Sequence, residues 1–79
     1  MNLKNFVDGI NILRPYYDKQ DGYHLGAEHD EVYLYATDKP VSEEDLKKLL
    51  SLGWFQSEGG AHEETPQDYN PSSGWMAFT

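Results

Sequence analysis

The chain has 79 residues, no cysteine, and a formal net charge of −8 at pH 7 from 14 acidic and 6 basic side chains. This acidity argues against binding to nucleic acid through phosphates, which needs a basic face. The lack of cysteine excludes disulfides and thiolate metal sites. A chain of this length forms one domain, residues 1–79. The N-terminus lacks a signal-peptide pattern and no apolar stretch approaches the roughly 20 residues that span a bilayer, so we expect a cytoplasmic protein.

The first predicted element is a helix over residues 2–14, with Asn2 as its N-cap. It ends at Pro15, because proline disfavours the helical conformation of the preceding residue and has no N–H to donate. Gly9 weakens a helix by up to about 1 kcal/mol relative to alanine, and in an alternative interpretation it splits the segment into a turn and a short strand. Apolar residues at helical spacing predict one buried stripe: Leu3, Phe6, Val7, Ile10 and Leu13.

Residues 21–37 predict a hairpin that turns at His29 and Asp30. Strand side chains alternate between faces, so a single register sorts this segment into two kinds of surface. The aliphatic face pairs Ala27 with Val32, Leu25 with Leu34 and Tyr23 with Ala36. The polar-aromatic face pairs Glu28 with Glu31, Gly26 with Tyr33 and His24 with Tyr35. A slip of one residue would undo this sorting.

A second helix is predicted over residues 43–52. Ser42 is its expected N-cap, and the three acidic residues that follow suit the positive end of the helix dipole. Gly53 suits the left-handed position that ends a helix and would bring Trp54 back onto Leu49.

Two further strands are predicted, over residues 54–58 and 75–78. Residues 59–73 between them contain two prolines, two glycines and few aliphatic side chains, which predicts a long mobile loop without regular structure. The element order is α-β-β-α-β-β, and it predicts an α+β fold with a small antiparallel sheet of about four strands packed against two helices. We expect the last two strands to form a second hairpin and Trp54, Trp75 and Phe78 to lie in the core.

No pattern in the chain predicts catalysis or a cofactor. The glycines are too scattered for a phosphate-binding loop, and there is no cysteine nucleophile. A metal site from His29, Asp30 and His62 is conceivable, but these residues lack the spacing of known metal motifs. We expect a protein that is not an enzyme and holds no native metal, with a metal-dependent enzyme as a distant third hypothesis.

The candidate binding surface is the polar-aromatic face of the hairpin with its acidic tip. Tyrosine is enriched at binding surfaces because it offers a large contact area at a small entropic cost. The candidate residues are His24, Glu28, Asp30, Glu31, Tyr33 and Tyr35. In an alternative interpretation the first helix packs on Tyr33 and Tyr35, and the face is a second core layer.

Three stretches of the chain resemble small uncharacterised proteins that bacteriophages and prophages encode: GYHLGAEHDEVYLY, VSEEDLKKLLSLGW and the terminal GWMAF. The resemblance covers residues 21–54 and the end of the chain. It implies no activity and carries over no catalytic residue, and it favours an interaction protein of phage origin.

Two functional hypotheses remain. The first is a small acidic module that binds a protein, with a basic partner or a second copy of the chain as candidates, and no direct contact with nucleic acid or membrane. The second is an inhibitor whose spaced carboxylates imitate nucleic-acid phosphates and occupy a host defence or DNA-binding protein. The acidity can also serve solubility alone.

Overall fold

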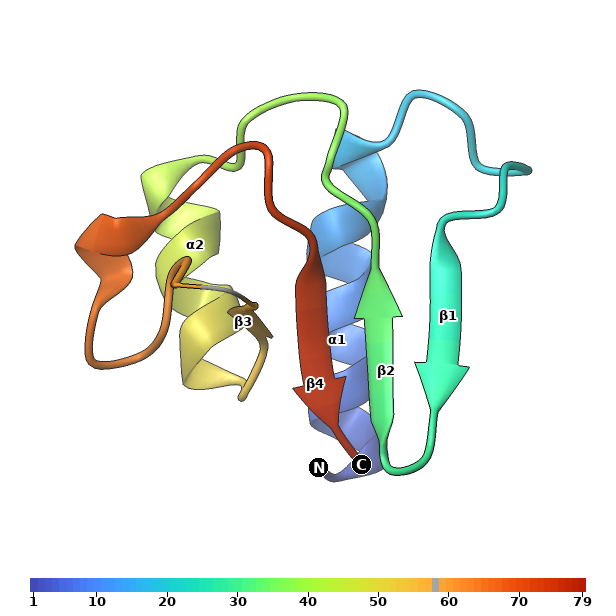
Figure 1. The fold of residues 1–79 in the computed structure, drawn as a ribbon, viewed down its shortest axis with the longest axis horizontal. Helices are drawn as coiled ribbons and strands as arrows, with labels where there is room; N and C mark the ends of the chain where they lie inside the picture. The colour runs from blue at the N-terminus through green and yellow to red at the C-terminus, as the bar shows by residue number, and fades with distance from the viewer. Residues whose placement is uncertain (58) are drawn as a thin grey trace.

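The chain folds into two helices and a four-stranded antiparallel sheet, in a computed structural model that describes residues 1–57 and 59–79. The elements are α1 (Leu3–Leu13), β1 (Leu25–Glu28), β2 (Glu31–Leu34), α2 (Glu43–Ser51), β3 (Phe55–Gln56) and β4 (Trp75–Phe78), with 3-10 turns at Arg14–Tyr16 and Pro66–Asp68. The strand order is β1-β2-β4-β3 (Figure 1). The predicted α+β class and element order are confirmed.

The hairpin has the register that the sequence predicts. Ala27 pairs with Val32, Leu25 with Leu34 and Gly26 with Tyr33. His29 takes a positive φ of 54° at the turn, a conformation in which histidine is enriched among non-glycine residues. The regular strands are shorter than the predicted pairing, since they begin at Leu25 and end at Leu34.

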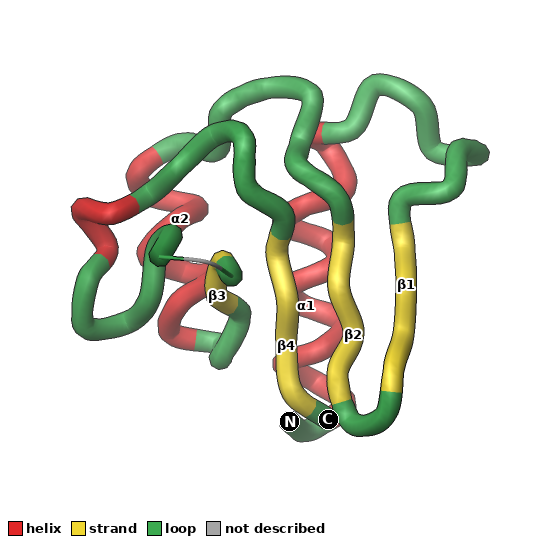
Figure 2. The backbone as a smooth tube through the Cα atoms, in the orientation of Figure 1, coloured by secondary structure: helices red, strands yellow, loops and turns green. Residues whose placement is uncertain are grey.

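The C-terminal strand lies inside the sheet, between β2 and β3 (Figure 2). Its pairing with β3 confirms the predicted second hairpin, and its pairing with β2 joins the two hairpins into one sheet. The third strand contains only Phe55 and Gln56, which is shorter than the predicted 54–58. Glu58, at the end of that prediction, lies outside the described residues.

Helix α1 begins as predicted, with the Asn2 side chain accepting the Asn5 amide at 2.7 Å. It runs unbroken through Gly9, so the alternative split at that residue is wrong. Its buried side also differs from the predicted stripe, because Leu3 and Val7 are exposed. The reason is Trp54, whose indole covers Gly9: a Cβ there would lie 2.0 Å from the Trp54 Nε1 atom. The helix therefore turns its glycine, rather than its whole apolar stripe, toward the core.

Helix α2 has both predicted ends. The Ser42 hydroxyl accepts the Asp45 amide at 3.2 Å. Gly53 has a φ of +99°, and the amides of Gly53 and Trp54 donate to the Leu50 and Leu49 carbonyls at 3.1 and 3.0 Å. This pair of bonds is the Schellman arrangement, which satisfies carbonyls that the helix end leaves free.

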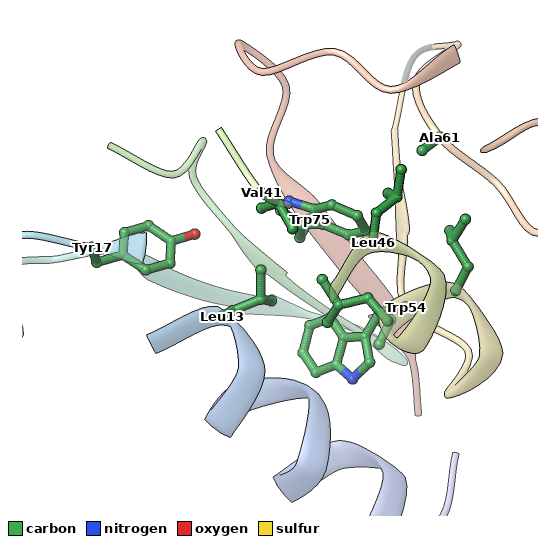
Figure 3. Close-up of a cluster of buried hydrophobic side chains, with 10 residues drawn as sticks. Leu13, Tyr17, Val41, Leu46, Trp54, Ala61 and Trp75 are labelled. Atoms are coloured by element: carbon green, nitrogen blue, oxygen red, sulfur yellow. The ribbon is translucent and has the colours of Figure 1, made fainter. Parts of the chain in front are cut away.

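The core lies between the helices and one face of the sheet (Figure 3). Its buried apolar residues are Leu13, Tyr17, Val41, Leu46, Leu49, Leu50, Trp54, Ala61, Trp75 and Ala77. Trp54 and Trp75 are core residues as predicted. Phe78 is 56% exposed, so its predicted place in the core is wrong. Its position on β4 alternates with that of Ala77, and it therefore points to the other side of the sheet.

The segment 59–73 is not without structure, contrary to the prediction. The fully buried Gln56 side chain holds it: Oε1 accepts the Ala61 and Asn70 amides at 3.0 and 2.9 Å. Gln56 Nε2 donates to the Asn70 and Ser73 carbonyls at 2.7 and 3.1 Å. One amide group thus replaces the ladder bonds that a longer strand would make. The predicted mobility of the segment stays a prediction.

Candidate functional site

The two faces of the sheet differ in what covers them. Figure 1 shows α1 behind β2 and β4, and the α2 leucines join the same core as Trp75 and Ala77. Within residues 1–57 and 59–79, no helix covers the opposite face, which we call the open face. The interpretation in which α1 packs on Tyr33 and Tyr35 as a second core layer is therefore wrong.

The open face is rich in aromatic and acidic side chains. Strand register and alternation assign to it Gly26, Glu28, Glu31, Tyr33, Phe55, Met76 and Phe78. The ring centroids of Phe55 and Phe78 are 5.3 Å apart, a distance typical of aromatic pairs. The Tyr33 ring lies over Gly26, where a Cβ would come within 2.4 Å of it. The absence of a side chain at Gly26 thus makes room for the Tyr33 ring.

A shallow hollow of about 390 Å³ lies on the open face. Tyr33, Tyr35 and Met76 line it on the sheet, and Ser57 and Ser72 line it from the loops that flank β3 and β4. Tyr35 is 63% exposed. The hollow therefore offers aromatic surface beside hydroxyl groups, a combination that suits a protruding side chain of another protein.

The structure brings most of the predicted surface together. Glu28, Glu31 and Tyr33 share the open face through the strand register, and Tyr35 adjoins Tyr33 in the hollow. Asp30 lies at the hairpin turn, where its carbonyl accepts the Thr79 amide at 2.6 Å. Glu28 lies directly opposite Glu31, although like charges opposite one another destabilise a sheet.

His24 is the exception among the predicted residues. Its ring centroid lies 4.9 Å from that of Tyr17, a core residue, and it lines a groove on the helix-covered side with Leu25. His24 does lie across from Tyr35, whose amide donates to the His24 carbonyl at 3.0 Å. Its predicted place on the polar-aromatic face is wrong, because its ring packs against Tyr17 on the other side of the sheet. The regular strand begins only at Leu25, so the alternation of faces does not extend to His24.

Sequence reasoning did not assign Phe55, His62, Met76 and Phe78 to this surface. The His62 ring stacks on Phe55 with centroids 5.0 Å apart, so the loop after β3 extends the aromatic surface. The alternation Trp75-Met76-Ala77-Phe78 is visible in the sequence and indicates two faces. It does not indicate that β4 lies beside β2, which is what puts Met76 next to Tyr33.

The two acidic clusters differ in their electrostatic setting. On α2, Glu43 and Glu44 pair with Lys47 and Lys48 at 3.5 and 3.4 Å, one turn further along the helix. At the hairpin tip, Glu28, Asp30 and Glu31 form no ion pair with any described residue. The carboxylates at this end of the open face therefore carry negative charge that no basic side chain of the described residues neutralises.

Within the described part of the chain, no group of three or more histidine, aspartate and glutamate side chains lies close enough to hold a metal ion. His29, Asp30 and His62 do not form such a group. Neither α1 nor α2 is long and apolar enough to cross a membrane, and the described residues contain no other α-helix. No protein-family model, curated protein or solved structure matches the chain. The resemblance to phage and prophage proteins stays a prediction.

Proposed function

We propose that this protein is a small protein–protein interaction module of phage or prophage origin that acts in the cytoplasm, is not an enzyme, and binds its partner through the open face. The observation that carries the proposal is a sheet whose one side packs against α1 and α2 in a common core, while its other side carries the exposed rings of Tyr35 and Phe78. Large contiguous apolar patches on the surface of a soluble protein commonly mark sites of protein–protein interaction.

The partner that fits this face has apolar and basic side chains. Tyrosine, phenylalanine and methionine are enriched where proteins bind one another, and Tyr33, Tyr35, Phe55, Met76 and Phe78 supply them here. Glu28 and Glu31 add two carboxylates at the same face, beside Asp30 in the turn. A lysine or arginine of the partner placed between Glu28 and Glu31 would relieve their repulsion, which gives binding an electrostatic contribution.

Imitation of nucleic acid is the alternative, with a host defence or DNA-binding protein as target. The placement of the acids favours the open face over this alternative. Figure 1 shows the hairpin turn at one end of the sheet and the start of α2 near the other end. The α2 acids are also engaged in capping the helix and in ion pairs. A mimic needs a continuous row of uncompensated carboxylates.

A comparative binding experiment tests the proposal. Wild-type protein, the Tyr33→Ala/Tyr35→Ala variant and a Tyr23→Ala control are immobilised, and bacterial host lysate is passed over each. Tyr23 is 97% exposed and is not part of the hollow, so its removal matches the loss of a tyrosine without changing the site. We expect wild type and control to retain a protein, identified by mass spectrometry, that the double variant loses. Equal retention by all three would contradict the proposal.

Salt dependence separates the two functions. A contact centred on Tyr33 and Tyr35 weakens modestly as salt rises, whereas phosphate imitation weakens steeply because its attraction is screened. Glu28→Gln/Glu31→Gln should lower the affinity of the retained partner and leave the aromatic contact in place. If that variant and high salt each abolish binding while the tyrosine variant binds normally, the mimicry hypothesis is the better one.

Binding between copies of the chain is measured separately. Sedimentation equilibrium of the wild type and the tyrosine double variant shows whether the open face joins two copies. A dimer that Tyr33→Ala/Tyr35→Ala dissociates identifies the partner as a second copy.

A further inference from the structure

A second concave surface lies on the other side of the sheet, beneath β1. Figure 1 shows α1 behind β4 and β2, with β1 standing beyond the helix. A groove of about 290 Å³ opens there between α1 and β1. Leu25 and Leu34 line it from the sheet, and Ile10 and Leu13 line it from the helix. Leu25 is 62% exposed although it belongs to the aliphatic face, because neither α1 nor α2 covers β1.

The floor of the groove is fixed and uncharged. Tyr17 is buried, and its hydroxyl donates to the Tyr35 carbonyl, which ties the floor to the end of β2. Burial raises the pKa of Tyr17 to about 12, and the Asp38 carboxylate adds to the shift, so the phenol stays neutral even where an ordinary tyrosine ionises. The His24 ring packs against Tyr17 at the rim. A ligand therefore meets a preformed, largely apolar surface.

The basic side chains at the groove differ from the other basic side chains of the protein in their lack of ion pairs. Of the six basic residues, four form ion pairs: Lys4 with Asp8, Lys39 with Asp18, Lys47 with Glu43 and Lys48 with Glu44. The other two, Arg14 and Lys19, have no ion pair with a described residue, and both line the groove. Arg14 Nε makes only a long bond of 3.4 Å to the neutral Gln20 side chain. No carboxylate of the described residues lines the groove.

We propose that this groove binds a small amphipathic carboxylate, a molecule with an apolar chain or ring that ends in one carboxyl group. The apolar part covers Leu13, Leu25 and Leu34, and the carboxylate reaches Arg14 and Lys19. Burial of the tail removes apolar surface from water. Hydrogen bonds between an ionised carboxylate and a cationic side chain are stronger than neutral ones, which makes the ligand's charge part of its recognition.

Octanoate is the test ligand, and octanol is its neutral match. Each is titrated into isotope-labelled full-length protein, and binding is followed by backbone amide shifts. We expect octanoate to shift the amides of Ile10, Leu13, His24 and Leu25 in a saturable manner, and octanol to shift the same amides with lower affinity. Shifts confined to the open face, or no saturable shift with octanoate, would overturn the proposal.

The charge requirement is tested with Arg14→Gln/Lys19→Gln. Both side chains are exposed, so the fold should survive, and the dispersion of the amide spectrum checks this. We expect the affinity for octanoate to fall about tenfold, the effect of losing a charge-assisted hydrogen bond, while octanol binds as before. Lys47→Gln, which removes an exposed base far from the groove lining, is the control and should bind octanoate normally. Equal octanoate affinity in the double variant and wild type would overturn the carboxylate assignment.

The groove and the open face lie on opposite sides of the sheet, so the two proposals fail separately. The Tyr33→Ala/Tyr35→Ala variant should bind octanoate with wild-type affinity even if it loses the protein partner. Loss of octanoate binding in that variant, with its fold intact, would overturn the assignment of the ligand to the groove.

Discussion

The two sides of β4 show how differently neighbouring residues of one strand are used. Trp75 and Ala77 are buried under the helices, whereas Phe78 is 56% exposed on the open face. All three are apolar, so composition does not separate them. The separation comes from the alternation of strand side chains and from the placement of α1 and α2 on a single side. Stability and binding are therefore expected to depend on different residues of the same strand.

The largest expected effect on stability comes from the face of the sheet that packs against the helices. Trp75→Ala should lower the free energy of unfolding by about 3–5 kcal/mol, as deletion of a buried aromatic side chain does. Phe78→Ala, three residues along β4 but on the open face, should cost about 1 kcal/mol or less. Urea denaturation of both variants measures the difference. Equal losses would show that the open face is covered in solution.

The next largest effect concerns the hydrogen bonds by which the buried Gln56 side chain fixes the loop 59–73. Gln56→Leu keeps the size of the side chain but leaves the amides of Ala61 and Asn70 without their acceptor, so we expect a loss of about 2–4 kcal/mol. Amide exchange at both residues should be slow in wild type and fast in the variant. The exposed Gln67→Leu is the control, and it should leave exchange unchanged. Fast exchange in the wild type would support the mobility that the sequence predicts for this loop.

Substitution of Gly53 tests the cap that ends α2. Gly53→Val should cost about 1 kcal/mol or more, because a β-branched residue resists the left-handed conformation at φ +99°. Gly53→Asn should cost less, since asparagine tolerates that conformation. Thermal melting of the two variants gives the comparison. A valine variant with the wild-type melting temperature would argue against the cap.

The smallest expected effect comes from the open face itself. Tyr33→Ala with Tyr35→Ala should change the free energy of unfolding by about 1 kcal/mol or less, because neither ring is in the core. Thermal melting of the purified variant is the measurement, and the same sample serves the binding experiment. A loss of several kcal/mol would mean that the tyrosines stabilise the fold. A loss of binding would then follow from unfolding and would not identify a contact with the partner.

Much of the secondary structure was predictable because its causes are local. Asn2 and Ser42 begin the helices, Gly53 ends α2, and the pattern from Leu25 to Leu34 sets the hairpin register. Each of these signals acts over a few residues, through a cap bond, a restricted dihedral angle or the alternation of a strand. The tyrosine face could be predicted for the same reason. Pro15 lies just after α1 as predicted, but the predicted reason is wrong, because Arg14 keeps helical dihedral angles and the chain continues as a 3-10 turn through Pro15.

The tertiary structure decided which surfaces are covered, since that depends on contacts between residues far apart in the chain. In the sequence, Gly9 is only a residue that weakens a helix, but in the structure it makes room for Trp54. Gln56 is only a polar residue of a predicted strand, but in the structure its side-chain amide binds the loop 59–73. The sequence by itself determined that one face of the hairpin is aromatic and acidic. Only the packing of both helices on the other face, and the insertion of β4 beside β2, left that aromatic face open and extended it with Met76 and Phe78.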